Sequence, residues 1–295
     1  MGEYLTRPGV GSIIVGRERD IGGFSVHRIL PHVQHRHIGP YVFFDHMGPA
    51  DFADHGGMDV RPHPHIGLAT MTYLLEGEIL HRDNLGTEQV ITPGAINWMT
   101  AGRGIVHSER TPPRVREAGV SRLHGIQVWI ALPTKDEECE PDFTHYPSES
   151  LPVVDVDGSR VRALVGSLYG ASSPVRTRSP LFYADAEMPE GASLPMTFGY
   201  EECAAYVTSG SISVGDTRLD ANSMLIFPPK ASPVLRAETN ARLMLLGGDR
   251  VDGPRHIFWN FVSSSQERIE QAKREWQEGK FPKVPGDADE FIPLP

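Results

Sequence analysis

The chain has 295 residues, enough for two domains of ordinary size, and its 39% hydrophobic and 22% charged content is typical of a folded globular protein. A net charge of -10 excludes a nucleic-acid groove spread over the whole surface, although it leaves room for a local basic patch. The two cysteines, Cys139 and Cys203, are too few and too far apart for a disulfide framework. No signal-peptide core and no membrane-length apolar run is visible, so we expect a cytoplasmic protein without membrane contact.

Glycine (30 residues) and proline (25 residues) are plentiful along the whole chain. Short apolar or alternating runs lie between these turn residues, which predicts strands rather than long helices. In the first half these runs are 12–15, 24–29, 41–44, 68–75, 79–83, 89–91, 95–99 and 125–132. Strands at this spacing predict an all-β barrel or sandwich over residues 1–134.

The stretch 135–150 is acidic and polar and contains two prolines, so we interpret it as a linker. A second set of strands is predicted after it, at 161–165, 181–184, 203–209, 211–214, 223–227 and 241–247. The rhythm of these strands resembles that of the first half. We therefore expect a duplicated barrel over residues 151–295.

One helix is predicted at about 264–279, within the second domain. Ser264 and Glu267 match a capping box, in which the hydroxyl and the carboxylate satisfy free backbone N–H groups. Gly279 is a natural end for the helix, and the tail after it is predicted to be extended. Three apolar residues fall on one helical face, namely Ile269, Ala272 and Trp276.

The distribution of histidine is the most informative feature of the sequence. Of the 13 histidines, 12 precede residue 146, and none lies between His145 and His256. If the chain forms two similar barrels, only the first can therefore hold a metal through imidazoles.

Two pairs of residues in the first half have the spacing of metal ligands. His63 and His65 are two residues apart, and so are His107 and Glu109. Residues i and i+2 of a strand share one face, so both members of each pair can point into the barrel. Three neutral imidazoles and one carboxylate suit a divalent transition metal, either as a closed tetrahedral zinc site or as an octahedral, iron-like site with open positions.

A lone H-x-H motif is weak evidence for a metal, but the second pair at a hairpin-compatible distance makes the metal site the favoured interpretation. His81 and Asp83 share a strand face near the predicted site. They are candidates for orienting a ligand, but an ordinary surface hairpin is the favoured interpretation. The remaining histidines are interpreted as structural or solvated, with Asp45-His46 noted as suggestive only: a loop cluster of His32, His35 and His37, and the separate His55, His124 and His145.

Gly102-Arg103-Gly104 precedes His107 closely enough for its glycines to let the backbone turn sharply beside the metal, although a simple turn is the alternative. This segment is not a phosphate loop, because no Lys-Ser/Thr pair follows it. The sequence also has no G-x-S-x-G motif, and neither cysteine has the surroundings of a nucleophile.

The stretch 61–109 resembles the pirin family of the cupin superfamily. It contains the strings H-P-H, L-L-E-G and A-G-R-G-I-x-H-x-E in the order found in pirins, and 39–49 (GPYVFFDHMGP) also resembles the corresponding pirin segment. The resemblance is sharpest over residues 39–130 and loose over the second barrel. It implies two cupin (double-stranded β-helix, or jelly-roll) barrels in tandem with a C-terminal helix, and a metal in the first barrel only.

The resemblance also implies the ligands and the activity. Pirins bind iron through three histidines and one glutamate, which match His63, His65, His107 and Glu109 here. We expect one divalent metal, with Fe(II) foremost and Mn, Co, Ni, Cu or Zn as alternatives. The general cupin motif has a glutamate four or five residues after the second histidine, but this chain has Ala69 and Thr70 there. The carboxylate ligand must therefore be Glu109, and the pocket differs from that of the many pirins with a glutamate near residue 69.

Some pirins are quercetin 2,3-dioxygenases, so the expected reaction is cleavage of a flavonol by dioxygen. Glu109 is then expected either to remain a ligand or to detach and act as general base. Two alternatives stay open: an enzyme acting on another small aromatic or enol substrate, and a non-enzymatic, iron-dependent redox sensor that regulates through protein partners. No direct contact with nucleic acid is expected in either case.

Overall fold

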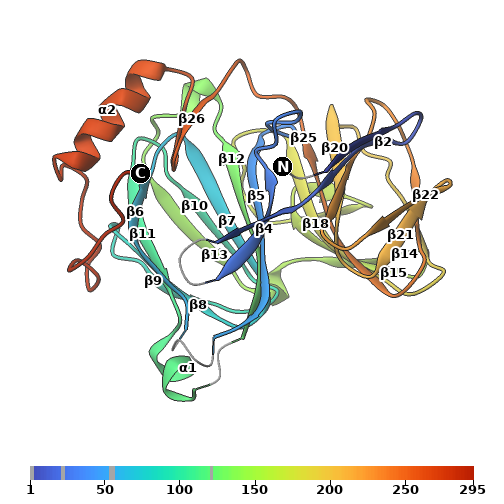
Figure 1. Cartoon of the computed structure of the whole chain (residues 1–295), viewed down its shortest axis with the longest axis horizontal. Coiled ribbons are helices and arrows are strands. Elements are labelled where there is room, and N and C mark those ends of the chain that lie inside the picture. The colour runs from blue at the N-terminus through green and yellow to red at the C-terminus, as the bar shows by residue number, and fades with distance from the viewer. Residues whose placement is uncertain (1–2, 21–23, 53–56, 120–121) are drawn as a thin grey trace. The chain divides into compact units, whose positions relative to one another are not determined.

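The computed structural model describes residues 3–20, 24–52, 57–119 and 122–295, and it is built mainly of antiparallel strands (Figure 1). His55 lies outside the described residues. The predicted all-β class with two barrels and a C-terminal helix is confirmed. No helix in the described part of the chain has the length and apolar character needed to cross a membrane.

The chain divides into two compact units that are not continuous in sequence. Unit 1 contains Met1–Arg19, Val26–His46 and Glu149–Arg250, and unit 2 contains Asp20–Ser25, Met47–Ser148 and Val251–Pro295. The predicted ranges 1–134 and 151–295 follow the chain, whereas the units exchange its two ends. Pairing between residues far apart in sequence causes this exchange: Ser12 pairs with Ile226 in unit 1, and Ile66 bridges to Phe261 in unit 2.

Unit 2 contains a barrel made of two antiparallel sheets, drawn in cyan to green in Figure 1. One sheet has the order β6-β11-β8-β9, and the other contains the order β13-β10-β7-β12. Strand β5 belongs to unit 1 up to His46 and to unit 2 from Met47. The stretch 135–150, interpreted above as a linker, supplies β13, which pairs with β10. The bounds are β5 Tyr41–Asp51, β6 Asp59–His65, β7 Leu68–Glu76, β8 Ile79–Asp83, β9 Glu88–Ile91, β10 Ile96–Thr100, β11 Ile105–Arg110, α1 Pro113–Glu117, β12 Arg122–Ala131, η1 Thr134–Asp136 and β13 Asp142–Tyr146.

Unit 1 contains the second barrel, and its largest sheet has the order β1-β2-β23-β20-β25-β18-β15-β14. A four-stranded sheet of order β19-β24-β21-β22 completes it. The bounds are β1 Tyr4–Arg7, β2 Gly11–Val15, β3 Arg17–Asp20, β4 Ser25–Leu30, η2 Ser148–Ser150, β14 Val153–Val156, β15 Ser159–Val165, β16 Ser167–Leu168, β17 Ala171–Ser172, β18 Leu181–Met188, β19 Ser193–Pro195, β20 Glu202–Ser209, β21 Ser211–Val214, β22 Thr217–Asp220, β23 Ser223–Ile226, β24 Val234–Ala237 and β25 Ala241–Gly248.

The interior of the unit 1 barrel is apolar. The described buried residues of its core are aliphatic side chains, phenylalanines and methionines, such as Phe182, Leu225 and Leu245. Burying such side chains stabilises the barrel, but they offer no imidazole or carboxylate to a metal. Unit 1 does include histidines, such as His32 and His46, because Val26–His46 belongs to it. The three-histidine group found among the described residues lies in unit 2.

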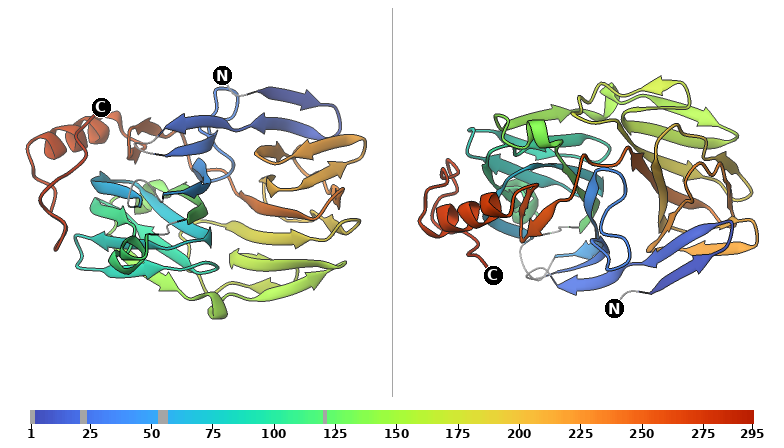
Figure 2. Two further views of the ribbon diagram at one scale, coloured as in Figure 1. Left: turned by 60° about the horizontal axis from the view of Figure 1, so that its bottom comes forward. Right: turned by 90° about the horizontal axis from the view of Figure 1, so that it is seen from above.

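The C-terminal helix α2 (Gln266–Gln277) belongs to unit 2 and packs beside the hairpin of β26 (His256–Phe258) and β27 (Phe261–Ser263), as Figure 2 shows. Its apolar face buries Ile269 and Ala272 against Ile66 and Phe261. The helix is confirmed, but its cap is Ser265, whose hydroxyl accepts from Arg268 N at 3.2 Å.

The predicted Ser264–Glu267 capping box is therefore wrong, because the N-cap lies one residue later at Ser265 and its N3 residue is Arg268. The reason is a competing partner, because both the backbone N–H and the hydroxyl of Ser264 donate to the Glu137 carboxylate.

Candidate metal centre

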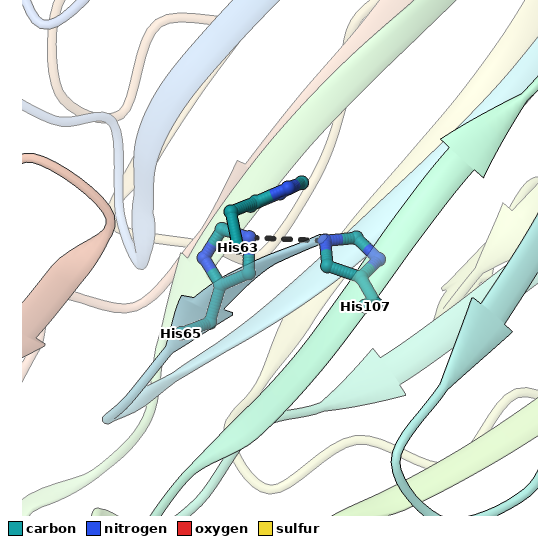
Figure 3. A group of neighbouring side chains, drawn as sticks. All are labelled: His63, His65 and His107. Carbon is teal, nitrogen blue, oxygen red and sulfur yellow. Dashed lines mark hydrogen bonds between the residues drawn. The ribbon is translucent and has the colours of Figure 1, made fainter. Parts of the chain in front are cut away.

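The predicted histidine pair and the predicted histidine–glutamate pair lie on neighbouring strands. His63 and His65 are on β6, and His107 and Glu109 are on β11, which pairs with β6 in antiparallel register. His107 lies directly opposite His63, and a bulge between His107 and Glu109 shifts the register. The members of each pair point into the barrel interior, where the imidazole rings of His63, His65 and His107 converge (Figure 3).

The distances between these rings fit a metal ion. One ring nitrogen from each of His63, His65 and His107 lies within 4.8 Å of the others, and His65 Nε2 is 3.1 Å from His107 Nε2. Two nitrogens bound at right angles to one metal, each at about 2.1 Å, would be about 3.0 Å apart. The donor set is therefore compatible with a transition metal in a cupin barrel.

The three imidazoles are buried, with exposed fractions of 6%, 1% and 1% for His63, His65 and His107. Burial lowers the pKa of His63 to about 4 and lowers the pKa values of His65 and His107 well below the ordinary value. All three rings are consequently neutral near pH 7, which is the form that binds metals.

Glu109 is on the same strand as His107 but is not part of the three-histidine group found among the described residues. Thr72 Oγ1 lies 3.5 Å from Glu109 Oε1 and donates more closely, at 2.6 Å, to Gln127 Oε1. Burial raises the pKa of Glu109 to about 7, with the Thr72 hydroxyl opposing that rise. The carboxyl is thus poised to hold or release a proton, and its role as a ligand stays a prediction.

His81 and Asp83 do not form an ordinary surface hairpin, and that interpretation is wrong. The two residues are 3% and 0% exposed. Strand β8 pairs with β11, which places Asp83 opposite His107 and His81 opposite Glu109. His81 Nδ1 lies 3.3 Å from His107 Nδ1, and His81 Nε2 lies 3.0 Å from Asp83 Oδ2.

The loop before β11 contains Gly102 and Arg103, which make backbone contacts within unit 2. Gly102 has φ +52°, and a Cβ there would overlap the carbonyl oxygen of Cys139. Arg103 N donates to the same carbonyl at 2.9 Å, and Gly102 O accepts from Gly67 N at 2.8 Å. Gly102 is therefore required by the approach to Cys139.

The other histidines have structural contacts. His35 Nε2 lies 3.1 Å from the Tyr4 hydroxyl, and the His32 ring stacks on Tyr4, so this loop caps the edge of unit 1. His145 contacts Asn97 Oδ1 at 2.6 Å, and His46 contacts the Tyr206 hydroxyl at 2.8 Å.

Sequence reasoning missed four residues beside the site. Thr72 lies near Glu109 and donates to Gln127, the Trp129 ring meets His65 edge-on at 5.1 Å, and the Phe143 ring stacks on His81 at 4.4 Å. A polar residue inside an apolar strand, such as Thr72 in 68–75, was the one available signal.

Comparisons with known proteins agree with this architecture. Residues 23–130 match the family model described as Pirin, and residues 183–282 match that of the Pirin C-terminal cupin domain. A pirin-like protein of Caulobacter vibrioides is 48% identical over 95% of this chain and 97% of its own length. A Pseudomonas aeruginosa protein named "Putative quercetin 2,3-dioxygenase" is 39% identical over 90% of this chain and 83% of its own.

A solved structure gives the same picture. Quercetin 2,3-dioxygenase from Acinetobacter baumannii superimposes with a TM-score of 0.90 at 33% identity, covering 97% of this chain and 95% of that protein.

Proposed function

The chain belongs to the pirin family, and from this premise we propose that it is a metal-dependent dioxygenase that cleaves flavonols such as quercetin. In this proposal His63, His65, His107 and Glu109 hold one divalent metal, with Fe(II) foremost. The observation that carries the proposal is the convergence of three buried, neutral imidazoles within 4.8 Å inside one barrel. The printed names of the similar proteins from P. aeruginosa and A. baumannii support the choice of substrate.

In this proposal the metal and the residues around it have separate chemical roles. When bound, the metal supplies a Lewis acid that lowers the pKa of a coordinated hydroxyl. The Glu109 carboxylate would either stay a ligand or detach and take the proton from the flavonol 3-hydroxyl as general base. The Thr72 hydroxyl lies 3.5 Å from Glu109 Oε1 and donates its hydrogen to Gln127 Oε1, so its oxygen can accept a hydrogen bond from the protonated carboxyl. The closely packed barrel walls keep bulk water from the reacting groups.

The test is a quercetin assay on protein reconstituted with Fe(II) under anaerobic conditions. With wild type, the quercetin absorbance should decrease while dioxygen is taken up. The rate of quercetin loss with His63→Ala should fall to that of the metal-free protein. His256→Ala is the matched control, because His256 is an exposed histidine of the same unit and lies outside the three-histidine group.

Equal, slow loss of quercetin in wild type and His63→Ala would contradict the proposal. Binding of one iron per chain without turnover would also contradict an enzymatic role. It would favour the alternative, an iron-dependent regulator whose partner binding changes with the oxidation state of the metal.

A further inference from the structure

A fully buried carboxylate on β8 is fixed by three donors. Asp83 is 0% exposed, and its Oδ1 accepts from Leu85 N at 2.9 Å and from Thr87 N at 3.1 Å. Its Oδ2 lies 3.0 Å from His81 Nε2. Both oxygens are thus occupied as acceptors, and the side chain cannot rotate without breaking backbone hydrogen bonds.

The ring of His81 is held equally firmly. The Phe143 ring stacks on it at 4.4 Å with an interplanar angle of 21°, which sets the plane of the imidazole. Its Nε2 faces Asp83, and its Nδ1 lies 3.3 Å from His107 Nδ1. The antiparallel register of β8 and β11 creates this contact.

These contacts determine which ring nitrogens of His81 and His107 carry a hydrogen. An ionised carboxylate only accepts, so His81 Nε2 carries the hydrogen that it donates to Asp83. The Nδ1 of a neutral His81 is then an acceptor, and His107 Nδ1 must donate to it. His107 Nε2, which is 3.1 Å from His65 Nε2, is left with its lone pair directed at the other imidazoles.

We propose that Asp83 and His81 are positioning residues that fix the tautomer of His107 so that its Nε2 is free to bind the metal. His63 reaches the same end more simply, because its Nδ1 lies 2.9 Å from the Arg61 carbonyl oxygen, which can only accept. The proposal rests on the metal-binding part of the proposed function and does not depend on turnover.

The substitution Asp83→Asn tests this assignment of hydrogens, because the asparagine side chain has almost the same shape as that of aspartate. An amide has one acceptor oxygen and one donor nitrogen. If its oxygen keeps the N–H groups of Leu85 and Thr87, its NH₂ group faces His81 Nε2, which must then become an acceptor. His81 Nδ1 would carry the hydrogen instead, and His107 would be driven to the tautomer with hydrogen on Nε2.

Two measurements follow from this. In metal-free, ¹⁵N-histidine-labelled protein, long-range ¹H–¹⁵N correlation spectra should show His107 protonated on Nδ1 in wild type and on Nε2 in Asp83→Asn. The dissociation constant for Co(II), measured by chelator competition, should rise about 10- to 100-fold in the variant. Asp185→Asn is the matched control, since Asp185 is a buried carboxylate of unit 1 paired with Arg242, and it should change neither quantity.

His81→Phe provides a second test if Asp83→Asn folds poorly. Phenylalanine can keep the stack on Phe143 but offers no acceptor, so His107 should show a mixture of tautomers and weaker Co(II) binding. A His107 tautomer and a Co(II) affinity equal to wild type in either folded variant would overturn the proposal. Because the tautomer is read in metal-free protein without substrate, failure of the quercetin assay would leave this test intact.

Discussion

At the scale of single residues, burial decides which side chains can do chemistry. His63, His65 and His107 are neutral near pH 7 because the barrel excludes water from their rings. Glu109 responds to the same burial in the opposite direction, since a desolvated carboxyl prefers its uncharged form. A bound cation would reverse this preference, so metal binding and the charge of Glu109 are linked.

Glu202 shows the opposite electrostatic situation in unit 1. Burial alone would raise the pKa of Glu202, but the His37 ring 3.7 Å away and hydrogen bonds from Gly39 N and Arg250 lower it to about 2. The folded pKa lies below the ordinary value of 4.5, so this carboxylate stabilises the fold above pH 4.5. That contribution is lost as the pH falls from 4.5 toward about 2.

We therefore expect Glu202→Gln to lower the free energy of unfolding by about 1 kcal/mol near neutral pH, a modest value because the side chain retains some exposure to solvent. The difference from wild type should shrink as the pH falls through the window below 4.5. Urea unfolding followed by circular dichroism measures it. An equal loss of stability at neutral and acidic pH would show that the charge of Glu202 is not the cause.

At the scale of elements, strand spacing predicted the three histidines of the cluster, whereas His81 and Asp83 were considered as orienting residues but not favoured. The i, i+2 pattern correctly placed His63 with His65 on one strand, because side-chain alternation is a local property. The contacts of Glu109 with Thr72 and of His107 with His81 depend on which strands pair, and that is decided by the whole sheet. The same limit hid the exchange of chain ends between the units, which rests on pairs such as Ser12 with Ile226.

The loop leading into β11 supports a prediction at this scale. Gly102→Ala should destabilise unit 2 by about 1–3 kcal/mol, because the added Cβ overlaps the Cys139 carbonyl in a left-handed backbone conformation. Gly119→Ala is the matched control: its φ is +69°, yet nothing lies within 4 Å of the new Cβ. The control separates backbone strain from the clash. Equal losses in the two variants, measured by urea unfolding, would contradict the account of Gly102.

At the scale of the whole molecule, the two units share a fold but differ in what their interiors can bind. The core of unit 1 is filled by apolar side chains, whereas unit 2 holds the three-histidine group identified within the described residues. We accordingly expect metal to stabilise unit 2 and to leave unit 1 unchanged.

Tryptophan fluorescence can measure how metal affects the stability of unit 2. All four, Trp98, Trp129, Trp259 and Trp276, belong to unit 2, so tryptophan fluorescence reports on the unfolding of that unit. Metal at about 100 times its dissociation constant should stabilise unit 2 by about 2.7 kcal/mol, and a chelator should reverse the shift. His107→Ala should remove the effect. A metal-dependent shift that persists in His107→Ala would place the ion elsewhere.

The claim that the histidine cluster holds a metal that turns over a flavonol is tested most directly by titrating metal-free protein with Fe(II) while the rate of quercetin-dependent dioxygen uptake is recorded. The rate should rise in proportion to bound iron and level off at one iron per chain, and His107→Ala should show no rise. A full complement of bound iron with no dioxygen uptake above that of the metal-free protein would contradict the account.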